Sequence, residues 1–288
     1  MKYYQAIFTI NPDSKDARDI LSALAGEAGF ESFEDADGGL KGYVQVDNFD
    51  KEALDTSIEN FPLEGVRISY DITEADDEDW NSAWEDQGFE PILIDGKCVI
   101  YDARDKERID ADHSMPQLKI GIEVRQAFGT GNHETTQMMV STLLGMDLKG
   151  KHVLDCGCGT GILGIVAAKC GAEEVVGYDI DDWSVRNARH NAEINGVSLE
   201  VFEGDKGVLS HISGVFDIVL ANINRNILLA DMDAFCDVMS KEALLVVSGF
   251  YDEDVDVLVD KARSLSLALV SRKEKDHWAC LVFKPSIK

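Results

Sequence analysis

The stretch VLDCGCGTG, from Val153 to Gly161, decides how the second half of the chain folds. An apolar run leads into Asp155, glycines follow as Gly157, Gly159 and Gly161, and a second apolar run, ILGIVAA, comes next. Glycines at such a turn let the backbone approach a ligand where any Cβ would clash. The spacing is G-x-G-x-G, whereas dinucleotide-binding proteins place the third glycine one residue later. The stretch therefore predicts a strand, a ligand-binding turn and a helix.

Apolar segments of strand length alternate with helical segments after residue 151. The strands read HVLDC, EVVGYDI, LEVFEGD, FDIVLANI and ALLVVSGF, which is typical of a parallel sheet buried on both faces. The expected helices cover residues 162–170, 183–195, 226–239 and 254–264. The final strands, LALVSRKE and HWACLVFK, are too close together for a crossover helix and predict an antiparallel hairpin. The predicted fold class is α/β, with a Rossmann-like seven-stranded sheet that ends in this antiparallel pair.

Four polar side chains come at the ends of successive strands: Asp155, Asp179, Asp205 and Asn222. The carboxyl ends of parallel strands share one edge of the sheet, where open α/β sheets bind ligands. Asp179 is placed to take both hydroxyls of a ribose, and Asp205 to reach an adenine amino group. Each residue alone could equally serve a turn or a helix cap. Because the glycine turn has no lysine or arginine for phosphates, S-adenosylmethionine, whose sulfonium is positive, fits these acids better than NAD.

A second glycine-bearing stretch, AFGTGNHETT, covers Ala127 to Thr136. It lacks the lysine of a phosphate-binding P-loop, and no clear strand leads into it. His133 and Glu134 begin a zinc-like pattern, but Gln137 stands where a second histidine ligand is needed. Neither a phosphate site nor a metal site explains the stretch, and no metal ligand is predicted.

Taken together, these stretches resemble a known family. The region from Ala127 to Lys284 is similar to class I methyltransferases, and AFGTGNHETT, VLDCGCGTGILGI, GYDID and ANI in combination resemble the ribosomal protein L11 methyltransferases. The resemblance extends to the N-terminal module and covers nearly the whole chain. It implies an enzyme that moves methyl groups from S-adenosylmethionine to lysine side chains and the N-terminal amine of ribosomal protein L11, free or on the ribosome.

The same resemblance implies how the loop from Phe128 to Thr136 acts. The loop is expected to fold over the bound donor, with Thr136 touching it and Phe128 to Thr130 near the methyl group. The family's binding positions correspond to Thr136, Gly157, Asp179 and Asn222, and Asn222 is also expected to orient the acceptor amine through its side-chain oxygen. The full set of predicted donor-binding residues is Phe128, Gly129, Thr136, Asp155, Gly157, Gly159, Gly161, Asp179, Asp205 and Asn222.

The loop departs from the family pattern at two places. Glu134 stands where the family usually has proline after the histidine, and Arg125-Gln126 stands where it usually has Pro-Gly. The geometry of the loop is therefore not transferred with the binding residues. His133 has two open interpretations, a direct role in the reaction or a cap of the following helix.

Methyl transfer to an amine needs a neutral nitrogen, and a free lysine has a pKa of about 10.4. The nearby sulfonium and burial both disfavour the ammonium form, so a dedicated base is not required. Two other functions stay open, namely methyl transfer to an amide or nucleobase amino group, and donor binding without catalysis. The chain has Asn222-Ile223-Asn224-Arg225 where amide- and nucleobase-directed enzymes usually carry Asn-Pro-Pro-Tyr or Asp-Pro-Pro-Tyr, and its intact motifs argue against a non-catalytic protein.

The N-terminal residues show a β-α-β-β-α-β order, which is the ferredoxin-like pattern. The expected strands and helices cover residues 3–10, 16–29, 30–33, 40–46, 51–60 and 66–72. No catalytic constellation is present, so we expect a substrate-recognition domain at residues 1–75. We expect a linker helix and connecting strands at residues 76–125, and the methyltransferase domain at residues 126–288.

The expected linker begins with an acidic segment, Glu74 to Asp86, in which Trp80 and Trp84 share one helical face. Two strand-like pieces, PILIDG and CVIYDA, follow it. The polar stretch RDKERIDADHSMPQ that comes next is expected to be a flexible loop.

The chain is strongly acidic, with 54 acidic against 27 basic residues and a formal charge of -27. Such a surface repels phosphate backbones and attracts a basic partner, although solubility alone could also explain it. The six cysteines form no C-x-x-C pair, which favours buried thiols over disulfides or zinc. No apolar run approaches the roughly 20 residues of a membrane span, and the N-terminus does not read as a secretory signal. We therefore expect a cytoplasmic monomer with a basic ribosomal protein as its partner, no nucleic-acid substrate and no membrane association.

Overall fold

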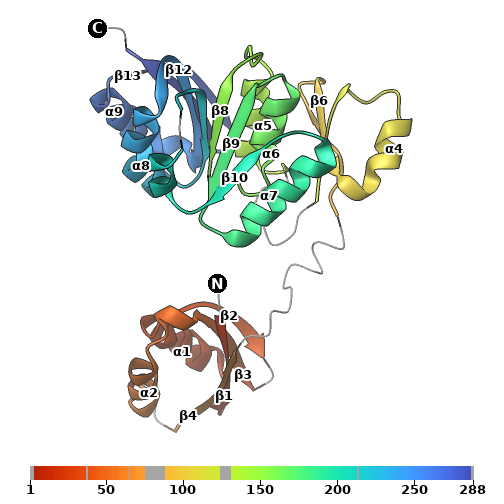
Figure 1. Ribbon diagram of the computed structural model, residues 1–288. Helices are drawn as coiled ribbons and strands as arrows, with labels where there is room; N and C mark the ends of the chain where they lie inside the picture. The colour runs from red at the N-terminus through yellow and green to blue at the C-terminus, as the bar shows by residue number, and fades with distance from the viewer. Residues whose placement is uncertain are drawn as a thin grey trace. The chain divides into compact units, whose positions relative to one another are not determined.

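The computed structural model of the chain describes residues 3–36, 38–63, 65–74, 88–123, 131–212 and 214–286 (Figure 1). The chain divides into two units, Met1–Trp80 and Asn81–Lys288. Each unit has its own hydrophobic core. The expected tryptophan-bearing linker helix, with Trp80 and Trp84, lies outside the described residues.

The first unit is an antiparallel sheet covered by two helices. Its elements are β1 (Tyr3–Asn11), α1 (Lys15–Glu27), β2 (Phe30–Ala36), β3 (Gly39–Gln45), the short 3-10 helix η1 (Val46–Asn48), α2 (Lys51–Glu59) and β4 (Arg67–Glu74). The strands lie in the order β2-β3-β1-β4, and every neighbouring pair is antiparallel. The predicted ferredoxin-like order is confirmed.

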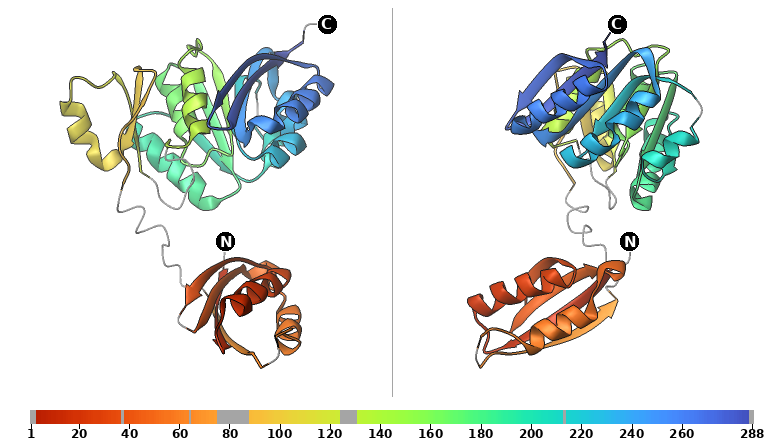
Figure 2. Two further views of the ribbon diagram at one scale, coloured as in Figure 1. Left: turned by 180° about the vertical axis from the view of Figure 1, so that it is seen from behind. Right: turned by 90° about the vertical axis from the view of Figure 1, so that its left-hand side faces the viewer.

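Local sequence explains the helices of this unit. Ser14 and Asp50 cap α1 and α2 by accepting from the backbone N–H three residues later. Both helices pack on one face of the sheet (Figure 2), where Phe8 of β1 is buried together with Leu21 of α1 and Leu54 of α2. Alternate residues of β1 point to the opposite face, as the period of a strand requires.

The second unit is larger and has an α/β architecture. Its elements are β5 (Ile92–Ile94), β6 (Cys98–Asp102), η2 (Ala103–Asp105), α4 (Lys106–Ala111), β7 (Leu118–Ile122), α5 (Glu134–Leu143), β8 (His152–Cys156), α6 (Ile162–Lys169), β9 (Glu174–Asp179), α7 (Asp182–Asn195), β10 (Glu200–Glu203), η3 (Lys206–Ser210), β11 (Phe216–Asn222), α8 (Arg225–Asp237), β12 (Met239–Tyr251), η4 (Asp252–Asp254), α9 (Val255–Ser264), β13 (Leu267–Lys275) and β14 (Trp278–Pro285).

Seven strands of this unit form the main sheet, in the order β10-β9-β8-β11-β12-β14-β13. The first five are parallel to one another, and β14 is antiparallel to both of its neighbours. The predicted Rossmann-like sheet with a terminal antiparallel pair is therefore confirmed. This topology brings the carboxyl ends of β8, β9, β10 and β11 to one edge of the sheet.

The helices α5, α6 and α7 lie on one face of the main sheet and α8 and α9 on the other (Figure 1), and each group packs on the sheet through its own core. One core contains residues of α5, α6 and α7, and the other contains residues of α8 and α9. Consecutive strand residues alternate between the two, since Val153 packs in the first core and Leu154 in the second. Burial on both faces explains why these strands are apolar throughout.

A separate sheet of three strands, β5-β6-β7, shares the first core, to which Ile94, Ile100 and Ile120 contribute. Its strands β6 and β7 are parallel. The stretch RDKERIDADHSMPQ between them is not a simple loop, because it contains η2 and α4. The expectation of a flexible loop was wrong because α4 buries a single apolar residue, Ile109, so its sequence shows no helical period. The strand β7 was not predicted.

Among the described residues, no helix is long and apolar enough to cross a membrane.

Candidate active site

Three glycines with positive φ shape the turn between β8 and α6. The φ angle is 68° at Gly157, 53° at Gly159 and 78° at Gly161, a region that other residues rarely adopt. The N–H of Gly157 donates to the Tyr178 carbonyl of β9 at 2.9 Å, which ties the turn to the neighbouring strand. A Cβ at position 157 would lie 2.5 Å from Cγ2 of Ile223. The turn therefore exposes backbone in a form that only glycine allows.

Asp179 lies at the end of β9, directly beside this turn. Its Oδ2 accepts from the N–H of Gly159 at 2.8 Å, and its Oδ1 accepts from the N–H of Asp181 at 3.1 Å. These two bonds fix the plane of the carboxylate. Because each carboxylate oxygen can accept more than one hydrogen bond, both remain suited to a pair of ribose hydroxyls.

Asp155 is the last residue but one of β8 and is buried, with only 1% of its surface exposed. Its Oδ2 accepts from the N–H of Gly164 in the first turn of α6 at 2.9 Å. Burial raises the pKa of this carboxyl to about 7, and the charge of Asp179 acts in the same direction, while the bond from Gly164 opposes it. Asp155 therefore supports the base of the glycine turn from inside the protein.

Asn222 ends β11, and its side-chain nitrogen donates to Oγ1 of Thr136 at 3.2 Å. Thr136 lies buried in the first turn of α5, so this bond joins two predicted site residues from distant parts of the chain. The next strand fixes the backbone beyond Asn222, because Ile223 N–H donates to the Ser248 carbonyl at 3.1 Å. Gly249, with a φ of 94°, allows this close approach of the two strands, since a Cβ at position 249 would lie 2.4 Å from the Ile223 carbonyl oxygen.

Asp205 follows β10, as the sequence indicated. It caps the short helix η3, and its Oδ1 accepts from the N–H of Gly207 at 2.8 Å. The turn role that the sequence left open is therefore present. The adenine contact stays a prediction.

Three aromatic rings pack together from the N-cap of α5, the end of β12 and the start of β14. Trp278 packs against Tyr251 with ring centroids 4.2 Å apart, and His133 and Trp278 form a T-shaped pair with centroids 4.6 Å apart. His133 is also the N-cap of α5, because its Nδ1 accepts from Thr135 N–H at 3.3 Å. We call Tyr251, Trp278 and His133 the aromatic cluster. Tyr251 and Trp278 were not predicted as site residues, although the pairing of β14 with β12 brings the start of β14 to the end of β12.

Most of the predicted site residues are thus brought to one edge of the sheet. Bonds or close contacts connect Gly159 with Asp179, Thr136 with Asn222, and Gly157 with the residue that follows Asn222. Phe128 and Gly129 lie outside the described residues, as do Arg125 and Gln126. Within the described part of the chain, no group of three or more His, Cys, Asp or Glu side chains is placed to hold a metal ion.

Comparisons with known proteins agree with this arrangement. A family model described as ribosomal protein L11 methyltransferase (PrmA) matches residues 9–286. A protein of Phocaeicola vulgatus named ribosomal protein L11 methyltransferase is 44% identical over 284 residues, which cover 98% of this chain and 99% of the relative. A protein of the same name from Thermotoga neapolitana is 32% identical and covers 99% of this chain and 100% of the relative. The chain belongs to the ribosomal protein L11 methyltransferase family.

Family membership confirms the resemblance seen in the sequence, and with it a methyltransferase that uses S-adenosylmethionine. The fold has a match among solved structures. A ribosomal protein L11 methylase from Lactobacillus delbrueckii subsp. bulgaricus aligns over 69% of this chain and 100% of its own, with a TM-score of 0.60 and 24% identity. The roles of the individual site residues stay predictions.

Proposed function

We propose that this chain transfers methyl groups from S-adenosylmethionine to lysine side chains and to the N-terminal amine of ribosomal protein L11. The substrate follows from the name that its relatives carry. The observation that carries the choice of an amine is the hydrogen bond from Asn222 to Thr136, which orients the Asn222 side chain.

The residues at the sheet edge fit the donor. Backbone exposed by Gly157, Gly159 and Gly161 admits close approach, and the oriented carboxylate of Asp179 suits a ribose. Acidic side chains also suit a positive ligand better than a phosphate. When bound, S-adenosylmethionine supplies the methyl group on a positively charged sulfur.

Asn222 is the residue that we propose to orient the acceptor. Its side-chain nitrogen donates to Thr136, which leaves the amide oxygen suited to accept a hydrogen bond from an amine. We propose that the ring of Tyr251, which is 48% exposed, attracts an alkyl ammonium before it loses its proton. Alignment of the neutral nitrogen with the methyl group then supplies the main part of the catalysis, through proximity.

The remaining roles are proposed from charge and organisation. With a net charge of -27, the chain attracts a basic ribosomal protein, free or on the ribosome, and repels nucleic acid. We propose that residues 1–75 recognise the substrate, that 76–125 connect the domains, and that 126–288 carry the reaction. A ribosomal substrate implies that the enzyme works in the cytoplasm, and we propose that it works as a monomer.

The test is a methyl-transfer assay with purified L11, followed by mass spectrometry of the modified residues. Asn222→Ala should lower kcat by about 100-fold or more, the range found when a positioned polar group is removed. The matched control is Asn226→Ala, because Asn226 is exposed on α8 a few residues later. Equal kcat values for the two variants would refute the role of Asn222, and methyl groups found only on sites other than amines would refute the substrate class.

The alternative acceptor, an amide or nucleobase amino group, is separated by the same assay. Incorporation of label into nucleic acid, with none into L11, would favour it. The residues after Asn222 are Ile223, Asn224 and Arg225, and none of them offers the flat aromatic face that grips a planar nitrogen. Donor binding without methylation of L11 or nucleic acid would instead indicate a non-catalytic protein.

A further inference from the structure

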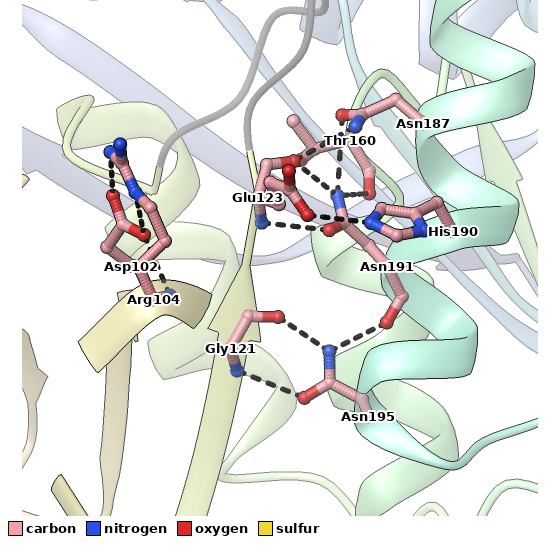
Figure 3. Close-up of polar contacts among 9 residues, drawn as sticks. All are labelled: Asp102, Arg104, Gly121, Glu123, Thr160, Asn187, His190, Asn191 and Asn195. Carbon is pink, nitrogen blue, oxygen red and sulfur yellow. Dashed lines mark hydrogen bonds and ion pairs between the residues drawn. The ribbon is translucent and has the colours of Figure 1, made fainter. Parts of the chain in front are cut away.

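The strand β7 forms an edge of the three-stranded sheet, yet part of its outer backbone is hydrogen-bonded by side chains. Asn195, in the last turn of α7, accepts from Gly121 N–H through its Oδ1 at 3.0 Å and donates from Nδ2 to the Gly121 carbonyl at 2.7 Å (Figure 3). One amide group thus makes the pair of bonds that a neighbouring strand would make.

Asn191 repeats this contact one helical turn earlier. Its Oδ1 accepts from Glu123 N–H at 2.9 Å, and its Nδ2 donates to the Glu123 carbonyl at 3.1 Å. Asn187 donates to the same carbonyl at 2.9 Å, and His190 Nε2 lies 2.7 Å from the Glu123 carboxylate. Residues four apart share one face of a helix, so the three asparagines form a single row, which we call the asparagine ladder.

The ladder is buried and conflicts with helix propensity. Asn187, Asn191 and Asn195 are 4%, 0% and 8% exposed. Asparagine is a poor helix former, and a buried amide without partners is costly. Here the amides are satisfied by backbone groups that would themselves be costly to leave unpaired. The arrangement therefore serves the tertiary structure and not the helix.

Asn191 differs from its neighbours because it also reaches the glycine turn. Its Nδ2 donates to the carbonyl of Thr160 at 3.0 Å, and Thr160 is fully buried between Gly159 and Gly161 (Figure 3). The helix touches the turn at a second point, since a Cβ at Gly161 would lie 3.0 Å from that of Ala188. The side chain of Asn191 thus connects Glu123, which follows β7, to Thr160. The residue before Thr160 is Gly159, whose N–H donates to Asp179.

We propose that Asn191 is a positioning residue that holds the glycine turn in its donor-binding conformation. Thr160 lies between Gly159 and Gly161, both with left-handed φ, so the glycines on either side place few intrinsic constraints on the peptide that carries its carbonyl. A hydrogen bond to its carbonyl fixes its orientation and, with it, the backbone that faces the donor. The proposal rests on the proposed donor site at this turn.

The test compares three variants of the full-length chain: Asn187→Ala, Asn191→Ala and Asn195→Ala. All three lose contacts of the ladder to β7 or Glu123, so all three should unfold at lower urea concentration than the parent chain. Titration calorimetry with S-adenosylmethionine should give a dissociation constant raised about tenfold for Asn191→Ala and less than threefold for the two flanking variants. In the methylation assay Asn191→Ala should raise KM for the donor and leave kcat nearly unchanged at saturating donor.

A second substitution keeps the volume of the side chain in case alanine prevents folding. Asn191→Asp can still accept from Glu123 N–H but faces the Thr160 carbonyl with a carboxylate oxygen, so it should also weaken donor binding, whereas Asn195→Asp should not. Equal dissociation constants at positions 191 and 195 would overturn the proposal and leave the ladder a structural contact only. A parent chain that fails to bind the donor at all would overturn the proposed donor site instead.

Discussion

Replacing Asp155 by asparagine should change how the stability of the protein depends on pH. The carboxyl of Asp155 is buried, and its pKa is raised to about 7 from an ordinary value of 3.8. In the unfolded chain the group ionises near its ordinary pKa. Between these two values the folded protein keeps the proton and the unfolded chain releases it. The contribution of Asp155 to stability is therefore fully present below pH 4 and is lost as the pH rises through 7.

The size of the effect follows from the two pKa values. Each pH unit between them costs about 1.4 kcal/mol, so the whole interval corresponds to about 4 kcal/mol. Between pH 5 and pH 8 the parent chain should lose about 3 kcal/mol from this group, because the slope ends near pH 7. Asparagine can accept from Gly164 N–H in the same way but cannot ionise.

The assay is urea unfolding, followed by tryptophan fluorescence, at several pH values from 5 to 8 without donor. The difference in unfolding free energy between the parent and Asp155→Asn should move by about 3 kcal/mol in favour of the variant as the pH rises. Glu242→Gln, which removes one exposed carboxylate, controls for net charge and should run parallel to the parent. Parallel curves for the parent and Asp155→Asn would refute the reasoning, since they would mean that the buried carboxyl is already ionised at pH 5.

Three further predictions concern the turn, the sheet edge and the first unit. Asp179→Ala should lose about 1.5–3 kcal/mol of donor affinity in calorimetry, the scale of hydrogen bonds to a charged group, whereas Asp182→Ala should bind as the parent does. Gly249→Ala should lower the unfolding free energy by about 3 kcal/mol or more, because its Cβ meets backbone at 2.4 Å, and Gly196→Ala, which meets nothing within 4 Å, by only about 1 kcal/mol. A chain beginning at Gly88 should bind the donor with unchanged affinity but fail to methylate L11, and a full methylation rate would contradict recognition by residues 1–75.

The main sheet could be predicted because its strands are buried on both faces. HVLDC and FDIVLANI, for example, match β8 and β11 closely, since a short, mostly apolar run between turn residues is typical of a strand buried on both faces. The helix α4 could not be predicted, because Ile109 is its only buried residue and its sequence therefore shows no helical period. The strand β7 could not be predicted either, because Lys119 and Gly121 interrupt its LKIGI run and weaken the apolar signal.

The same division holds for the site. Asp179 and Asn222 were predictable as ligand-edge residues because the topology of a parallel sheet gathers strand ends. Trp278 was not, since its place beside His133 depends on the register of β14 against β12. The sequence RNARHNAEIN contains a signal for the asparagine ladder, because asparagines at positions 187, 191 and 195 are unfavourable in a helix unless their amides have partners.

The asparagine ladder also relates two different repeat distances. Four residues of helix advance about 6.0 Å and two residues of strand about 6.6 Å, so Asn195 and Asn191 can meet Gly121 and Glu123 in turn. Inserting one residue between the two asparagines would rotate one of them by about 100° and break the match, whereas a strand pair tolerates a slip of two residues. The mismatch of about 0.6 Å grows with every added rung, which restricts such a row to short strands. Within that limit, a helix can end a sheet and close its edge to further strands without the proline or exposed charge that edge strands otherwise need.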